Sequence, residues 1–96
     1  MSEMSKTDIG TIQAVAHCDR FGWKFCTGRS IRIRDVRRLV ARGLLRDAGL
    51  ASAVDGDGWT IQPERWKQSW ELTDAGRAEV AQIKEAQRVE IESWGA

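Results

Sequence analysis

The sequence predicts one small α+β domain that is mostly helical, with three main helices and a two- to three-stranded β-sheet. Apolar residues recur at helical spacing in three segments, and strand-forming and turn-forming residues lie between the second and third of these. The length of 96 residues is enough for one hydrophobic core but not for two. We therefore interpret residues 1–96 as a single domain.

A first helix is expected over about residues 8–19. Ser5 or Thr7 can cap its N-terminus, and Asp8 lies where the helix dipole favours a negative charge. The core face of this helix would consist of Ile9, Ile12, Val15 and Ala16. In the ten residues from Arg20 to Arg29, aromatic side chains alternate at positions 21, 23 and 25, which favours an extended segment.

A second helix is expected over about residues 31–42, capped by Ser30 and ended by Gly43. At 100° per residue, its apolar side chains fall within an arc of about 140°. These side chains are Ile33, Val36, Leu39, Val40 and Leu44. The opposite side carries Arg34, Arg37, Arg38 and Arg42, while Arg32 falls near the apolar edge. This helix therefore has a core face and an arginine face.

A strand beginning at Leu44–Asp47 can pair with Trp70–Leu72. The connection between them, Ala48–Ser69, is long for a hairpin loop. It contains a turn signal at Asp55–Gly58, followed by a segment with strand character at Trp59–Gln62. We expect an elaborated loop with an added short strand.

A closing helix is expected over about residues 74–92, with Thr73 as its cap and Asp74 in its first turn. Its apolar residues are compatible with one broad side, and they are Ala75, Ala78, Val80, Ile83, Ala86, Val89 and Trp94. The remainder of this helix is acidic, with Glu79, Glu85, Glu90 and Glu92.

The formal net charge of +1 conceals a sharp division along the chain. Residues 20–46 carry nine basic groups and one acid, Asp35, and therefore a charge of +8. Residues 47–96 carry five basic and ten acidic groups, for a charge of −5, and residues 1–19 add −2. Such a polarised charge distribution can orient the molecule toward a polyanion.

Several other classes of function are disfavoured. His17, Cys18 and Cys26 are too few ligands for a structural zinc site, so we expect no metal and no cofactor. His17 and Cys18 are adjacent on a helix and cannot form a nucleophile dyad, so we expect no enzyme and no catalytic residues. No apolar run reaches about 18 residues and no secretory signal is recognisable, so we expect a cytoplasmic protein with no membrane partner.

Two motifs together resemble a known superfamily. The spacing Ser-(12 residues)-Gly-Leu-Leu from Ser30, with Leu39 four residues before the glycine, resembles recognition helices of MarR- and PadR-like winged helix-turn-helix regulators. Leu-Thr-Asp-Ala-Gly-Arg at 72–77 resembles the segment that closes the wing in these proteins. The resemblance covers residues 30 to about 81 and implies a winged-helix domain whose wing spans about 44–72.

The resemblance also implies a binding site for nucleic acid. Its residues would be Arg29, Arg32, Arg34, Arg37, Arg38 and Arg42 around the recognition-type helix, and Arg65 and Lys67 in the wing. Arginine suits this role because its guanidinium can pair bidentately with guanine or phosphate. Trp66 is expected to pack under the wing rather than stack on a sugar, because an exposed tryptophan is costly without a partner.

One element of the family pattern has no counterpart. Winged-helix regulators carry a helix of about two turns between the first and recognition helices, and here only residues 20–29 separate the two. Either this element has shrunk to a turn, or the chain has kept the winged-helix core and lost its usual grip on DNA.

The sequence leaves two functions open. The first is a small transcriptional regulator that binds double-stranded DNA, with the closing or first helix supplying a homodimer contact. The alternative is a protein-binding winged-helix module, such as a phage or mobile-element inhibitor of a host nucleic-acid-binding complex. The five tryptophans and the acidic C-terminal half suit the alternative.

Overall fold

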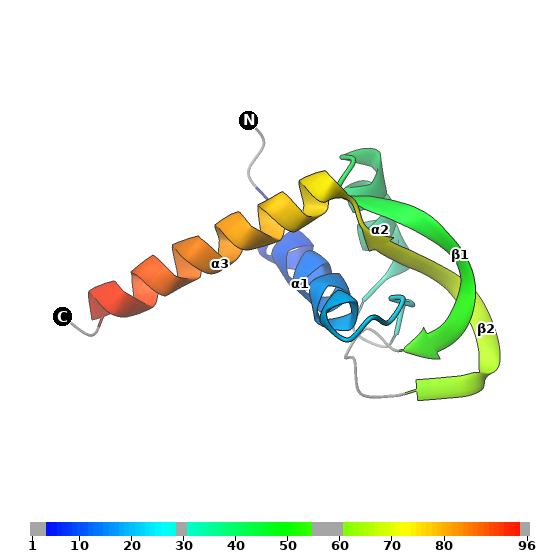
Figure 1. Ribbon diagram of the computed structural model, residues 1–96. Coiled ribbons are helices and arrows are strands. Elements are labelled where there is room, and N and C mark those ends of the chain that lie inside the picture. The colour runs from blue at the N-terminus through cyan, green and yellow to red at the C-terminus, as the bar shows by residue number, and fades with distance from the viewer. Residues whose placement is uncertain (1–3, 29–30, 55–60, 95–96) are drawn as a thin grey trace.

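The computed structural model describes residues 4–28, 31–54 and 61–94. Three helices and one two-stranded antiparallel sheet follow each other in the order α1 (Lys6–Arg20), α2 (Ile33–Ala41), β1 (Leu45–Val54), β2 (Ile61–Leu72) and α3 (Asp74–Trp94). The two strands form a long curved ribbon, and α3 crosses α1 before its C-terminal half projects beyond the rest of the molecule (Figure 1). The α+β class and the three helices are as predicted.

The first helix is capped by Ser5, one of the two candidates. The Ser5 hydroxyl accepts a hydrogen bond of 3.1 Å from the amide of Asp8, and the helix extends from Lys6 to Arg20. Residues 21–28, which the structure describes, contain no second helix, only a turn at Gly22 and an extended segment. Phe25 in this segment forms an isolated antiparallel bridge with Trp70 of β2.

The second helix is shorter than predicted. It begins at Ile33 with Arg32 as its N-cap, so the prediction that Ser30 caps it is wrong; Ser30 itself lies outside the described residues. Gly43 has φ +77°, its amide donates to the Val40 carbonyl, and the Leu44 amide donates to the Leu39 carbonyl. These two bonds form a Schellman motif, so the predicted glycine stop is confirmed.

The sheet is simpler than predicted. Leu45 pairs with Leu72 and Asp47 with Trp70, as expected, but the pairing continues to Val54 and Ile61. The residues assigned to a long loop are therefore mostly in the two strands, and Ile61 and Gln62 extend β2 instead of forming a third strand. The turn expected at Asp55–Gly58 lies outside the described residues.

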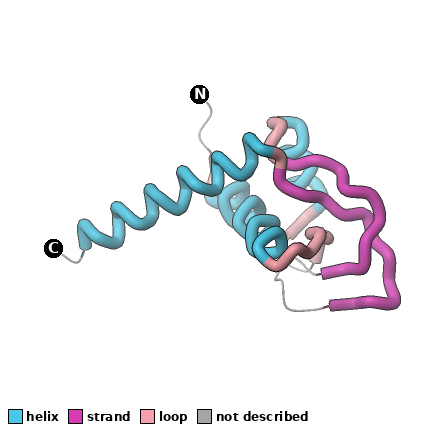
Figure 2. The backbone as a smooth tube through the Cα atoms, in the orientation of Figure 1, coloured by secondary structure: helices cyan, strands magenta, loops and turns pink. Residues whose placement is uncertain are grey.

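The core lies where α1, α2 and the base of the β-ribbon meet (Figure 2). Leu39 and Val36 of α2 are fully buried, as the predicted helical phase requires. Ile33 is an exception, because it is the first residue of the helix and is 39% exposed. The other buried apolar residues are Ile12, Val15, Cys18, Phe25, Cys26, Leu45, Trp70, Leu72 and Val80.

The prediction of one broad apolar side for α3 is wrong. Val80 is buried and Ile83 is partly buried against the core, but Val89 is 53% exposed. Ala75, Ala78 and Ala86 are also exposed, and the side chain of Trp94 is outside the described residues. The apolar packing of the helix is thus confined to its first half, and farther along Gln13 Nε2 of α1 donates to Gln87 Oε1 at 3.3 Å. None of the helices in the described residues is long and apolar enough to span a bilayer.

The two sequence motifs contact each other directly. The Thr73 hydroxyl accepts a hydrogen bond from the Gly76 amide, so Thr73 caps α3 as predicted, and it donates to the Gly43 carbonyl at 2.6 Å. The Thr73 amide donates to the Leu44 carbonyl. A Cβ on Gly76 would lie 2.1 Å from that same carbonyl oxygen. The end of α2 and the start of α3 are therefore locked together through backbone contacts.

Candidate functional site

The solvent-facing side of α2 carries two arginines, followed by a small residue near the C-terminus of the helix. Arg34, Arg37 and Ala41 lie three or four residues apart and are all exposed. The Arg34 side chain is 72% exposed, and Arg37 forms no ion pair with any residue that the structure describes. Arg32, at the N-cap, is also exposed. Arg34 and Arg37 therefore form an exposed arginine row on α2 that is available to a ligand, with Arg32 apart from it at the N-cap.

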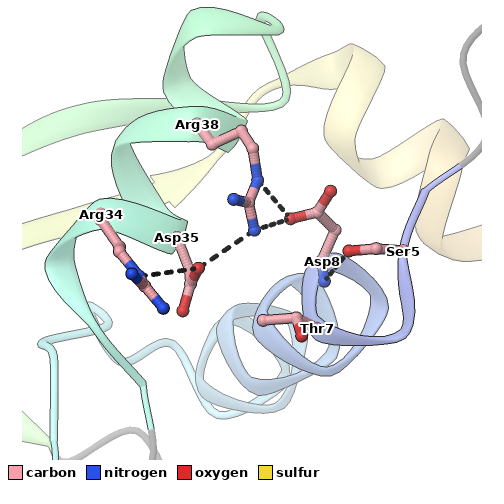
Figure 3. Close-up of a pocket in the computed structure, with 6 residues that line it drawn as sticks. All are labelled: Ser5, Thr7, Asp8, Arg34, Asp35 and Arg38. Carbon is pink, nitrogen blue, oxygen red and sulfur yellow. Dashed lines mark hydrogen bonds and ion pairs between the residues drawn. The ribbon is translucent and has the colours of Figure 1, made fainter.

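Arg38 belongs to a different environment, although it was predicted for the same face. Its Nε donates to Asp8 Oδ1 at 2.8 Å, and its Nη2 lies 2.6 Å from the same oxygen (Figure 3). Nη2 also donates to Asp35 Oδ1 at 3.0 Å. Asp8 and Asp35 are only 4% and 6% exposed. Hydrogen bonding to Asp8 is the main reason why the pKa of Arg38 is raised.

Arg42, like Arg38, contacts the carboxylate of Asp8. Its Nη1 lies 3.5 Å from Asp8 Oδ2, and its side chain is 26% exposed. The arginine face predicted from the sequence is thus divided in two. Arg38 and Arg42 hold α2 against α1, whereas Arg34 and Arg37 face solvent. This division corrects the expectation that all four side chains are presented together to a ligand.

Asp35 lies between the arginines that hold α2 against α1 and those that face solvent, in contact with Arg38 on one side and Arg34 on the other. Its Oδ1 accepts from Arg38 and lies 4.0 Å from Arg34 Nε (Figure 3). The start of α1 and the first turns of α2 enclose a shallow pocket of about 440 Å³ beside these residues. The pocket is lined by Ser5, Thr7, Asp8, Arg34, Asp35 and Arg38.

Sequence reasoning missed Asp8 and Asp35 as members of this site. The sequence indicates for Asp8 only a favourable position in the helix dipole, because its partners are 30 and 34 residues away. The available signal was the single acid in a basic segment, Asp35, three residues before Arg38. No cluster of three or more His, Cys, Asp or Glu side chains that could hold a metal ion occurs in the described part of the chain.

The β-ribbon presents two different faces. Ser52 pairs with Trp66 and Leu50 with Gln68, so these four residues share one face, and Trp66 and Leu50 are 67% and 66% exposed. The prediction that Trp66 packs under the ribbon is therefore wrong. Lys67 alternates to the other face, where it is half-buried. The Arg65 side chain and all of Arg29 lie outside the described residues.

A further cluster of charges lies at the base of the ribbon. Glu71 of β2 accepts hydrogen bonds from Lys24 and from Arg46, the latter at 2.6 Å. Hydrogen bonding from Lys24, and then from Arg46, lowers the pKa of the Glu71 carboxyl. Both cations are thereby paired, and neither adds to the exposed row on α2.

Comparison with known proteins adds no relative to this picture. No protein-family model matches the chain, and neither a curated protein nor a solved structure shows significant similarity to it. The functional interpretation therefore depends on the residues and their geometry.

Proposed function

We propose that this protein is a small winged-helix protein that binds double-stranded DNA through α2, in the manner of a transcriptional regulator. The observation that carries this proposal is the exposed row of Arg34 and Arg37 on a helix whose acidic residue is turned inward. An α-helix fits the major groove of B-DNA, and arginine can contact both guanine and phosphate. Ala41, at the end of the row, has a small side chain that leaves room for α2 to approach the DNA closely.

The order of the elements supports the same proposal. An arginine-bearing helix, a two-stranded ribbon and a closing helix follow one another, as in the winged-helix regulators that the two sequence motifs resemble. Arg38 and Arg42, tied to Asp8, connect α2 directly to α1. We infer that this connection supports α2 in place of the missing second helix. DNA binding is then assigned to Arg32, Arg34, Arg37 and Lys67.

The test compares two double variants with the same change in net charge. Arg34→Gln/Arg37→Gln removes the exposed row, and Arg77→Gln/Arg88→Gln removes two exposed charges from α3. Fluorescence anisotropy with a random duplex should show a loss of about 10- to 100-fold for the first variant. The second variant should lose much less. Equal losses would show that overall charge, and not the α2 row, determines binding.

A second candidate function has an observation of its own. Trp66 and Leu50 are two-thirds exposed on the same face of the ribbon, and tryptophan is a residue type that anchors protein interfaces. This pair favours a protein-binding module as the alternative. Trp66→Ala should then abolish capture of the partner while leaving the thermal melting temperature nearly unchanged. Retained capture by Trp66→Ala would remove this patch as the anchor.

A further inference from the structure

The pocket between the first turn of α1 and the start of α2 combines hydroxyl and guanidinium groups. Ser5 and Thr7 are exposed on the α1 side, and Arg34 lies on the α2 side (Figure 3). Arg34 is also a member of the exposed arginine row. The pocket is therefore continuous with the surface that we assign to DNA.

The carboxylates in this pocket are already neutralised. Asp8 accepts from Arg38 through Oδ1 and from Arg42 through Oδ2, while Asp35 accepts from Arg38. Among the residues that the structure describes, the guanidinium groups of Arg34, Arg38 and Arg42 lie beside these two carboxylates, a surplus of one positive charge. Arg34 has the most exposed of these side chains, and its Nε is 4.0 Å from Asp35, so the surplus charge is presented to solvent by Arg34. A phosphodiester group carries one negative charge and matches this surplus.

The hydroxyl groups supply uncharged donors at the same place. The Ser5 oxygen accepts a hydrogen bond from the Asp8 amide, which leaves its own proton to be donated. Thr7 is exposed, and its carbonyl, not its hydroxyl, is engaged with Thr11. Serine and threonine hydroxyls and arginine side chains are common ligands of the phosphates of DNA.

We propose that this pocket seats one phosphodiester group of the DNA backbone. Arg34 supplies the charge, and Thr7 and Ser5 donate hydrogen bonds to its oxygens. This inference rests on the proposed function and extends the interface from α2 to the start of α1. The start of α1 would then contact the DNA backbone beside the nine-residue α2 and help to fix the position of α2 on the duplex.

The test places a carboxylate in the pocket without weakening α1. Thr7→Asp puts a negative charge in the first turn of the helix, where the dipole favours it, so the protein should stay folded. Gln82→Asp makes the same charge change at an exposed position of α3 and serves as the control. Affinity for a random duplex should fall by at least about 10-fold for Thr7→Asp and by less than about 3-fold for Gln82→Asp. Thr7→Ser keeps the hydroxyl and should bind as the parent does.

The outcomes separate this inference from the function on which it rests. If Thr7→Asp and Gln82→Asp weaken binding equally, the proposed phosphate site is wrong while DNA binding stands. The same conclusion follows if Thr7→Ser binds DNA as poorly as Thr7→Asp. If the unmodified protein binds no duplex even at low salt, both the proposed function and the proposed phosphate site are wrong. Melting temperatures equal to the parent's within a few degrees show that each variant is folded.

Discussion

The carboxylate of Asp8, in the first turn of α1, binds the guanidinium of Arg38, in the middle of α2, at 2.8 Å from Nε and 2.6 Å from Nη2. This contact joins the two helices on the side of α2 that the sequence assigns to a ligand. Asp8 is buried, whereas the Arg38 side chain is 46% exposed. Without Arg38 the Asp8 carboxylate would lose a partner inside the protein, whereas without Asp8 the Arg38 guanidinium could still be solvated by water. The pair fixes α2 on α1.

Replacing Asp8 should therefore destabilise the domain. Asp8→Asn removes the charge that Arg38 and Arg42 share, and we expect a loss of about 1–3 kcal/mol in the free energy of unfolding by urea denaturation. Asp74→Asn is the control, because Asp74 is fully exposed in the first turn of α3, and it should cost less than about 1 kcal/mol. Similar losses for the two variants would contradict the structural role of Asp8.

The junction between α2 and α3 should not tolerate a methyl group at Gly76. Gly76→Ala would place Cβ 2.1 Å from the Leu44 carbonyl oxygen, so the backbone must shift, and we expect a loss of about 2–4 kcal/mol. Gly10→Ala in α1 meets nothing within 4 Å and should stabilise the protein by about 0.5–1 kcal/mol. Thermal and urea unfolding of both variants measure this contrast. A stable Gly76→Ala variant would contradict the close approach of α3 to Leu44.

Leu39 tests the orientation of α2. It is fully buried in the core, so Leu39→Ala should cost about 2–5 kcal/mol in the free energy of unfolding. Leu50→Ala removes the same atoms from a side chain that is 66% exposed on the ribbon and should change stability by less than about 0.5 kcal/mol. Equal effects would show that α2 is rotated about its axis relative to the structure.

Glu71 should make the stability of the protein dependent on pH in the acidic range. Its pKa is lowered from 4.5 by Lys24 and Arg46, so its contribution is fully present above about pH 4.5 and is lost as the pH falls through the lowered value. Glu71→Gln should thus be less stable than the parent at neutral pH, by no more than about 1 kcal/mol. The difference should shrink on acidification, as measured by urea unfolding at a series of pH values. A difference that is constant from pH 7 to pH 3 would contradict the ion pairs.

Local signals in the sequence predicted the ends of the elements well. Gly43 and Thr73 act through bonds to nearby backbone groups, and a glycine stop and a threonine cap are recognisable from a few residues. The buried face of α2 was also predictable, because Val36 and Leu39 lie on one side of any helix drawn through this segment. Ser30 failed as a cap because the helix begins three residues later.

Contacts between distant segments were beyond sequence reasoning. The pairing of Asp8 with Arg38 depends on how α1 packs against α2, and neither residue type nor spacing specifies that packing. Trp66 is exposed because the alternation of β2 sends Ser69 and Lys67 toward the other face, and the register with β1 decides which face this is. The arginine face was therefore identified, but not its division into structural and exposed members.

The central claim is that the exposed arginine row on α2 binds duplex DNA, and binding of the unmodified protein at two salt concentrations tests it most directly. Fluorescence anisotropy with a random duplex at about 50 and 200 mM salt should show submicromolar affinity at the lower concentration. Contact with about four phosphates would make log K fall with log salt at a slope of about −3.6, an affinity loss of roughly 100-fold between the two conditions. No binding at 50 mM salt would contradict the account and favour the protein-binding alternative centred on Trp66 and Leu50.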